Sequence, residues 1–141
     1  MQNITEAIAE QIADLLNTQN QLADTFMAQD ILDNRDCYRV RLDFGGLVLG
    51  VVRVREVQWY QWEIDHLSVR PDVRCHGIGT ELVREAEERA KQQGALIAQC
   101  TIRDGNEASE TLFRKRGYTA TVTFLSPHTG NHVTAYQKNL T

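Results

Sequence analysis

Residues 66–94 read HLSVRPDVRCHGIGTELVREAEERAKQQG. Pro71 cannot donate to a strand ladder and biases the residue before it away from helix, so the strand predicted over 62–69 ends there. Beyond the loop, apolar residues recur at helical spacing, and Gly94 stands where a glycine commonly ends a helix. The stretch therefore predicts a strand, a glycine-containing loop and a helix in succession.

The predicted helix has two distinct faces. Its apolar stripe consists of Ile78, Leu82, Val83, Ala86 and Ala90. The opposite, charged face consists of Glu81, Arg84, Glu85, Glu87, Glu88 and Lys91. A short apolar strand follows over 95–102, so residues 62–102 form a β-α-β unit. Right-handed crossover then makes its two strands parallel neighbours.

Upstream of this unit the hydrophobic period changes. Helical spacing of apolar residues begins at Ile4 and predicts a first helix, and a second short helix is expected through Leu22 and Phe26. A loop is expected over 30–36. Alternation over 38–44 then predicts a half-buried strand, and Gly45-Gly46 supplies the turn to a partner strand over 47–55.

Downstream of the unit, Asn106 is placed to cap a helix that ends at Gly117. Two strands over 118–125 and 133–138 then close as a hairpin. The predicted fold class is α/β (α+β), with a mixed, mostly antiparallel central sheet. The parallel β-α-β unit lies at the centre of that sheet, and helices flank it.

Composition restricts the class of protein. The chain has 141 residues, 42% of them hydrophobic and 24% charged, which is typical of one globular domain over 1–141. No apolar run reaches the length of a membrane span and no secretory signal pattern is present, so we expect a cytoplasmic protein. The three cysteines and four histidines show no metal-ligand spacing, so no metal site is predicted.

Charge is distributed unevenly. The net charge is −4, but residues 1–40 hold seven acidic and two basic residues, for a net −5. No basic stripe indicates a nucleic-acid partner. The acidic lobe favours a cationic partner, although a solvated acidic face explains the same composition.

The loop over 74–80 carries the strongest chemical signal. Glycines let a backbone approach a ligand closely, and the first turn of a helix presents unpaired amides and partial positive charge. Together they suit a diphosphate. A dinucleotide fingerprint would need a glycine at Leu82, and a Walker loop would need Lys-Ser/Thr after its last glycine, so neither fits. A purely structural tight turn remains an alternative reading of the two glycines.

At this point the chain resembles a known family. The pattern Arg/Gln-x-x-Gly-x-Gly/Ala is matched by Arg74, Gly77 and Gly79, and the segment NEASETLFRKRGY follows the next strand. Both features are similar to those of the GCN5-related N-acetyltransferase (GNAT) family. The resemblance covers residues 38–138, and it implies that residues 1–36 form a helical lobe on the acceptor side.

The resemblance implies acetyl-coenzyme A (acetyl-CoA) as co-substrate. The loop amides would hold the diphosphate, and the pantetheine arm would pair with the strand that ends at Val69. The coenzyme-binding residues expected on this basis are Leu67, Ser68, Val69, Arg74, Cys75, His76, Gly77, Ile78, Gly79, Thr80, Asn106, Ser109 and Phe113.

The resemblance also implies direct attack of an amine on the thioester. Glu63 occupies the strand position of a general base, and Asp65 lies two residues away on the same face; both being partly exposed strand-end acids is the competing explanation. Phe113 stands where the family often has a tyrosine acid. We therefore expect Tyr118 to be the substitute proton donor, with a packing tyrosine as the alternative.

These features predict an N-acetyltransferase acting on a primary amine. The acidic segment 30–36 favours a cationic acceptor: a polyamine, an aminoglycoside-like compound, a protein lysine or an N-terminal amine. Phe113 motivates a second hypothesis, a catalytically weak CoA-binding regulator or interaction module. An enzyme of charged tRNA is disfavoured by the missing basic surface. The family's first strand has no counterpart in the sequence, and an open sheet edge suggests a homodimer.

Overall fold

The computed structural model describes residues 3–19 and 25–141. Its helices are α1 (Glu6–Gln19), α2 (Ala28–Asp33), α3 (Ile78–Gln92) and α4 (Glu107–Lys115). Its strands are β1 (Tyr38–Leu42), β2 (Val48–Gln58), β3 (Gln61–Val69), β4 (Ile97–Arg103), β5 (Thr119–Leu125) and β6 (His132–Asn139). No helix within the described ranges is both long enough and apolar enough to span a bilayer.

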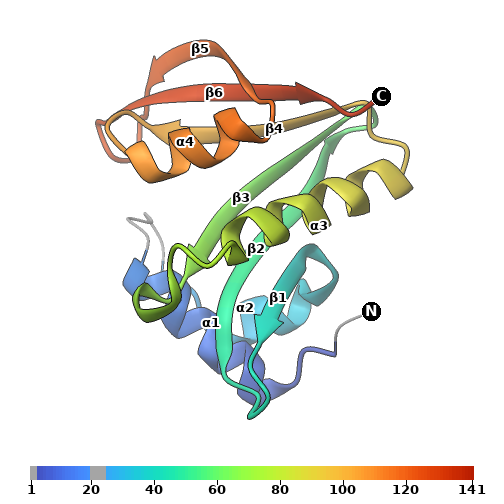
Figure 1. Ribbon diagram of the computed structural model, residues 1–141, viewed down its shortest axis with the longest axis vertical. Coiled ribbons are helices and arrows are strands. Elements are labelled where there is room, and N and C mark those ends of the chain that lie inside the picture. The colour runs from blue at the N-terminus through green and yellow to red at the C-terminus, as the bar shows by residue number, and fades with distance from the viewer. Residues whose placement is uncertain (1–2, 20–24) are drawn as a thin grey trace.

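The strands form one sheet in the order β1-β2-β3-β4-β6-β5 (Figure 1). Only β3 and β4 pair in parallel; the other neighbours are antiparallel. These two strands are joined through α3 and lie in the middle of the sheet, so the predicted fold class and its central β-α-β unit are confirmed. The first strand of the described residues, β1, forms one edge, and β5 forms the other.

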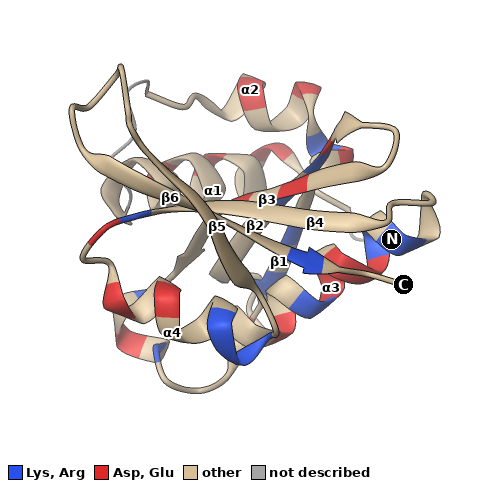
Figure 2. Cartoon of the chain, turned by 90° about the horizontal axis from the view of Figure 1, so that it is seen from above, with Lys and Arg blue, Asp and Glu red and all other residues tan. Residues whose placement is uncertain are grey.

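Helices cover the two faces of the sheet unequally. Figure 2 shows α1 and α2 on one side and α3 and α4 on the other. Beneath α1 and α2 the buried apolar residues include Ile12, Leu16, Ile31, Val40 and Val51. Beneath α3 and α4 they include Val54, Ile64, Leu82, Val83 and Phe113. Val51 of β2 lies in the first core and Val52 and Val54 in the second, so this strand contributes to both.

Three capping predictions are confirmed. Gly94 has a φ of +88° after the end of α3, and Gly117 has a φ of +96° after α4. The side chain of Asn106 accepts a hydrogen bond from the Ser109 amide (3.3 Å), which caps the first turn of α4. Acidic residues then occupy the first turn of α4 and basic residues its last, as Figure 2 shows, and both complement the helix dipole.

The prediction for the second helix is wrong in position. Leu22 lies outside the described residues, and Phe26 precedes α2. The expected loop over 30–36 is instead helical at its start and a 3-10 turn at its end. Asp30 stabilises this short helix, because its carboxylate accepts a hydrogen bond from the Met27 amide (2.8 Å).

The charged face predicted for α3 is wrong at Glu87, which is only 3% exposed. Its carboxylate accepts hydrogen bonds from the Tyr118 hydroxyl (2.9 Å) and Lys138 Nζ (3.1 Å), and it pairs with Arg116. Two of the partners lie between α4 and β5, and Lys138 lies on β6. This buried carboxylate therefore ties α3 to the C-terminal part of the sheet.

We predict that Glu87→Ala lowers the free energy of unfolding by about 3 kcal/mol, because it leaves one hydroxyl and two cations without their buried acceptor. Urea denaturation measures the change. The matched control is Glu88→Ala on the exposed side of the same helix, expected to stay within about 0.5 kcal/mol of the parent. Equal losses in the two variants would show that the Glu87 network contributes little.

Candidate active site

The two central strands separate soon after they meet. β3 and β4 pair only at Gln61 with Ile97, Trp62 with Ala98 and Glu63 with Gln99. Beyond that point β3 continues beside β2 alone, and β4 continues beside β6 alone. Figure 1 shows the two strands diverging toward the N-terminal end of α3 and toward α4. The β3 edge that faces β4 over 64–69 consequently has no strand partner among the described residues.

A bulge accompanies this divergence. Between the register pairs of Arg53 with Asp65 and of Val51 with Ser68, β3 contains one residue more than β2. His66 has a φ of +52°, a left-handed conformation that is uncommon for a residue with a side chain. Because a bulge bends the strand that carries it, β3 turns away from β4 just after their pairing ends.

The loop before α3 presents its backbone outward. Cys75 and Gly77 both have positive φ, +67° and +81°. The first hydrogen bond of the helix runs from the Glu81 amide to the Gly77 carbonyl (3.0 Å). The amides of the first turn precede that bond, so they have no acceptor within the helix and add to the positive end of its dipole.

The two glycines of the motif are required for different reasons. A Cβ at Gly77 would meet nothing within 4 Å, so its left-handed φ is what favours glycine there. A Cβ at Gly79 would lie 3.0 Å from Leu112 Cδ1. Gly79 thus lets α4 pack closely on the first turn of α3, which brings both helices to the divergence of β3 and β4.

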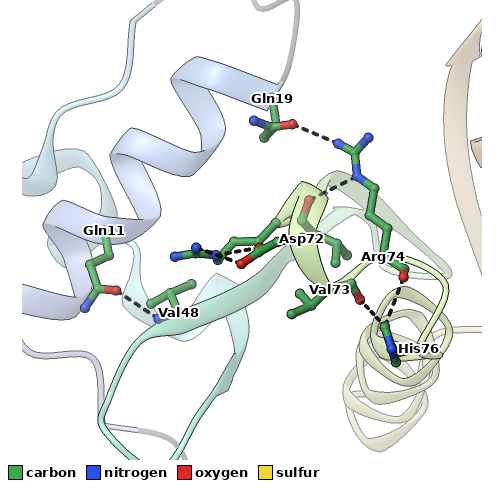
Figure 3. Close-up of polar contacts among 9 residues, drawn as sticks. Gln11, Gln19, Val48, Asp72, Val73, Arg74 and His76 are labelled. Carbon is green, nitrogen blue, oxygen red and sulfur yellow. Dashed lines mark hydrogen bonds and ion pairs between the residues drawn. The ribbon is translucent and has the colours of Figure 1, made fainter.

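Side chains of the loop surround this turn (Figure 3). Arg74 donates from Nε to the Val69 carbonyl (3.3 Å) and from Nη2 to Gln19 Oε1 (2.8 Å), so its guanidinium lies between the loop and the end of α1. His76 Nδ1 lies 3.0 Å from the Arg74 carbonyl and points back into the loop. Arg74 is exposed, which leaves it available to an anion.

The remaining predicted coenzyme residues line the same region. Leu67 and Val69 are half-buried on the part of β3 that has turned away from β4, and Ser68 between them is buried. Ile78 and Thr80 lie in the first turn of α3, and Ser109 lies in the first turn of α4. The structure therefore brings together the residues that the sequence placed in three separate segments.

Two aromatic residues lie deeper than that group. Phe113 is 4% exposed and packs edge-on against Tyr118, with ring centroids 5.0 Å apart. Burial and the Glu87 carboxylate raise the pKa of Tyr118 far above its ordinary value. Its hydroxyl proton is committed to Glu87, and this geometry argues against Tyr118 as a proton donor to a leaving group.

The two carboxylates of β3 have different surroundings. Asp65 receives a bidentate pair from Arg53, at 2.8 and 2.7 Å. Glu63 is half-buried, and its carboxylate makes no hydrogen bond or ion pair with another described residue. Burial, and then the charge of Asp65, raise the pKa of Glu63. Glu63 is therefore the carboxylate that can accept a proton, and it stands at the last β3–β4 pair.

Three residues near Glu63 were not singled out from the sequence: Arg53, Arg55 and His66. Arg53 Nη2 lies 3.4 Å from His66 Nε2, and burial lowers the pKa of His66. Only the strand register, with its bulge, shows that these side chains gather around Glu63. Among residues 3–19 and 25–141, no His, Cys, Asp and Glu side chains are grouped as metal ligands would be.

A pocket of about 520 Å³ opens on another side of the loop, between α1 and the residues that follow β3. Gln11, Val48 and Asp72 line it (Figure 3). Glu63 and the first turn of α3 are not part of its lining, so we leave this pocket outside the candidate active site.

Comparison with known proteins identifies the family. A family model described as "Acetyltransferase (GNAT) family" matches residues 5–118. An L-methionine sulfoximine/L-methionine sulfone acetyltransferase of Pseudomonas paraeruginosa is 34% identical over 83 residues, which cover 56% of this chain and 48% of the relative. The chain thus spans about half the length of the curated relatives it matches.

Solved structures share the fold. The protein yncA of Salmonella typhimurium, solved with its cofactor acetyl-CoA, superposes with a TM-score of 0.81 at 19% identity, covering 97% of this chain and 91% of that one. An aminoglycoside 6′-N-acetyltransferase in complex with coenzyme A gives a TM-score of 0.82 at 14% identity, covering 100% and 95%.

The raised pKa of Glu63 predicts an effect on stability. The folded protein holds the Glu63 proton more tightly than the unfolded chain does, so the contribution of Glu63 to stability falls as the pH rises above about 4.3, the ordinary glutamate pKa. We expect Glu63→Gln to raise the Tm at pH 7.5, and the gain to disappear near pH 4.

The neighbouring carboxylate supplies the control, measured in the same thermal melts. Asp65→Asn removes the charge that Arg53 holds, and we expect it to lower stability by about 1–3 kcal/mol at pH 7.5. A lower Tm for Glu63→Gln than for the parent at pH 7.5 would contradict the account of Glu63.

Proposed function

The chain belongs to the GNAT acetyltransferase family, and we propose that it transfers the acetyl group of acetyl-CoA to a primary amine. The observation that carries the proposal is the position of Glu63. A half-buried carboxylate without a bonded partner stands where β3 and β4 separate. The exposed amides of α3 lie at the open end of the same divergence.

The residues present suit the coenzyme at both ends. The first-turn amides of α3 and the Arg74 guanidinium provide donors and positive charge for a diphosphate. The part of β3 that follows its last pair with β4 provides backbone groups for an extended amide-containing arm, in the manner of an added strand. Asn106 and Ser109 stand at the start of α4, whose Leu112 lies beside Gly79 of α3.

The reaction needs a free amine, because an ammonium group has no lone pair. Glu63 takes one proton from the acceptor ammonium, and the nitrogen attacks the acetyl carbonyl carbon. The carbon–sulfur bond then breaks to release the coenzyme thiolate, and the amide nitrogen loses its second proton to water. A carboxylate with a raised pKa suits this proton transfer near neutral pH. We propose that a backbone amide near Leu67 donates a hydrogen bond to the carbonyl oxygen and stabilises the negative charge that develops there.

The departing thiolate has no evident proton donor in this chain. Phe113 lacks a hydroxyl, and the Tyr118 hydroxyl donates to Glu87. A thiol has an ordinary pKa of about 8.5, so the thiolate is a tolerable leaving group near neutral pH. We therefore propose a reaction that proceeds without protonation by a side chain, and Tyr118 stays a prediction that this geometry does not favour.

The acceptor is proposed to be cationic at least at its reacting group, since a primary amine is protonated near neutral pH. The sequence suggested that the acidic region around α2 favours a cationic partner. In the structure, however, the carboxylate of Asp30 accepts a hydrogen bond within its own helix. The named Pseudomonas relative is an acetyltransferase of L-methionine sulfoximine and L-methionine sulfone. A small amino-acid derivative therefore joins the proposed acceptors.

Two further expectations stay proposals. A cytoplasmic location rests on the cysteine and composition pattern of the sequence. A homodimer rests on the open edges of the sheet, where every residue of β5 is exposed.

The alternative function, a CoA-binding regulator, is favoured by one observation. Phe113 is buried against Tyr118, so the helix position that often supplies an acid in the family supplies packing here. Such a protein would bind the coenzyme tightly and release no thiol above the hydrolysis background.

Thiol release from acetyl-CoA with a panel of amines tests the two functions. We expect the parent to turn over at least one amine, with kcat/KM rising with pH through the raised pKa of Glu63. Glu63→Gln should lower kcat by about 10²- to 10⁴-fold and remove that rise, because the base is gone.

The matched control is Glu56→Gln, an exposed carboxylate on β2, which should leave both parameters unchanged. Coenzyme binding, followed as a rise in Tm with acetyl-CoA, should survive in both variants. Binding without thiol release for any amine, or equal turnover in Glu63→Gln and the parent, would favour the regulator.

A further inference from the structure

A cationic side chain lies directly beside the proposed base. Arg55 of β2 is the register partner of Glu63 on β3. Directly paired residues of antiparallel strands place their side chains on the same face, with Cβ atoms about 4.5–5.5 Å apart. Val51 packs in the core beneath α1 and α2, and Arg53 and Arg55 lie two and four residues farther along β2, so all three side chains are on one face. Arg55 and Glu63 are therefore on the sheet face that α1 and α2 cover in part. Arg55 and Glu63 therefore stand together on the acceptor side.

Arg55 makes an ion pair with Asp65 but no hydrogen bond to the carboxylates around it. Its nearest anionic contact is Asp65 Oδ2 at 3.6 Å, beyond hydrogen-bond distance, and its side chain is 48% exposed. Asp65 already receives two short bonds from Arg53. The Arg55 guanidinium consequently keeps its donors, arranged in the fork that matches a carboxylate.

Charge on this face points the same way. Glu63 and Asp65 carry two negative charges, Arg53 and Arg55 carry two positive charges, and burial lowers the pKa of His66. An acceptor that is only cationic would give this group of side chains a net positive charge, next to an arginine. An acceptor that carries both an ammonium and a carboxylate leaves it neutral.

We propose that Arg55 binds a carboxylate of the acceptor while Glu63 receives the proton of its amine, so that the acceptor is an amino acid. In an α-amino acid the two groups share one carbon, which suits two side chains that are direct neighbours across strands. The inference rests on the proposed function and narrows its acceptor class. Polyamines are disfavoured, since a second ammonium would approach Arg55.

The test compares acceptors that differ in this charge alone. Leucine, methionine, glutamate and lysine are each supplied as the free L-amino acid and as its carboxamide, with spermidine as a polycation, and thiol release from acetyl-CoA gives kcat and KM. The amine of a carboxamide is the less basic of the pair and is more often free near neutral pH. A preference for the acid must therefore come from recognition of the carboxylate.

We expect the parent to prefer the best amino acid over its carboxamide by at least about tenfold in kcat/KM, the size of one charge-assisted interaction. Arg55→Gln should lower kcat/KM for the acid by about 10- to 100-fold, chiefly through KM, and leave the carboxamide nearly unchanged. The control is Arg84→Gln, an exposed arginine on α3, which should leave the preference intact.

The outcomes that contradict the role of Arg55 differ from the outcome that contradicts the acetyltransferase function. A parent that acetylates carboxamides or spermidine as well as amino acids contradicts the role of Arg55 and leaves the acetyltransferase standing. An Arg55→Gln variant that loses the same factor on both members of a pair also contradicts it, because such a loss is structural. Release of no thiol with any amine contradicts the proposed function and this inference together.

Discussion

The candidate active site depends on the short length over which β3 and β4 are paired. Three register pairs join them, and the bulge at His66 then bends β3 away. Parallel strands joined through a helix normally remain neighbours, so their separation leaves backbone hydrogen-bonding groups in the middle of a sheet without a strand partner. A protein retains such groups where an extended ligand can pair with them, and the start of α3 faces the same opening.

The second consequence concerns charge. The separation begins at Glu63, which leaves that carboxylate half-buried at the end of the paired segment while Asp65 is neutralised by Arg53. β3 thus carries two different carboxylates. Asp65 is held in an ion pair, whereas Glu63 has no bonded partner and burial raises its pKa. The same register brings Arg55 beside Glu63, so the base and a half-exposed arginine occupy one face of the sheet.

Much of the fold could be predicted because its signals are local. The change of period around Pro71, the cap at Asn106 and the glycine after α3 each act within one or two turns of chain. Glu87 could not be predicted, since the other charged residues expected on its face of α3 are exposed or half-buried and its three partners follow 29 to 51 residues later in the sequence. Arg55 was missed for a related reason: counting register from the hairpin turn fails when a bulge shifts it. The short helix α2 buries only Ile31, which is too little for a periodic pattern.

The central claim is that the first turn of α3 and Arg74 bind the diphosphate of the coenzyme at the divergence of the two strands. Isothermal titration with coenzyme A and with pantetheine, which lacks the diphosphate and the 3′-phosphoadenosine attached to it, tests it most directly. Helix-terminal amides together with a charge-assisted arginine contact predict that pantetheine binds about 100-fold more weakly, and that the difference shrinks as salt is added. Equal affinities for the two ligands would contradict the claim.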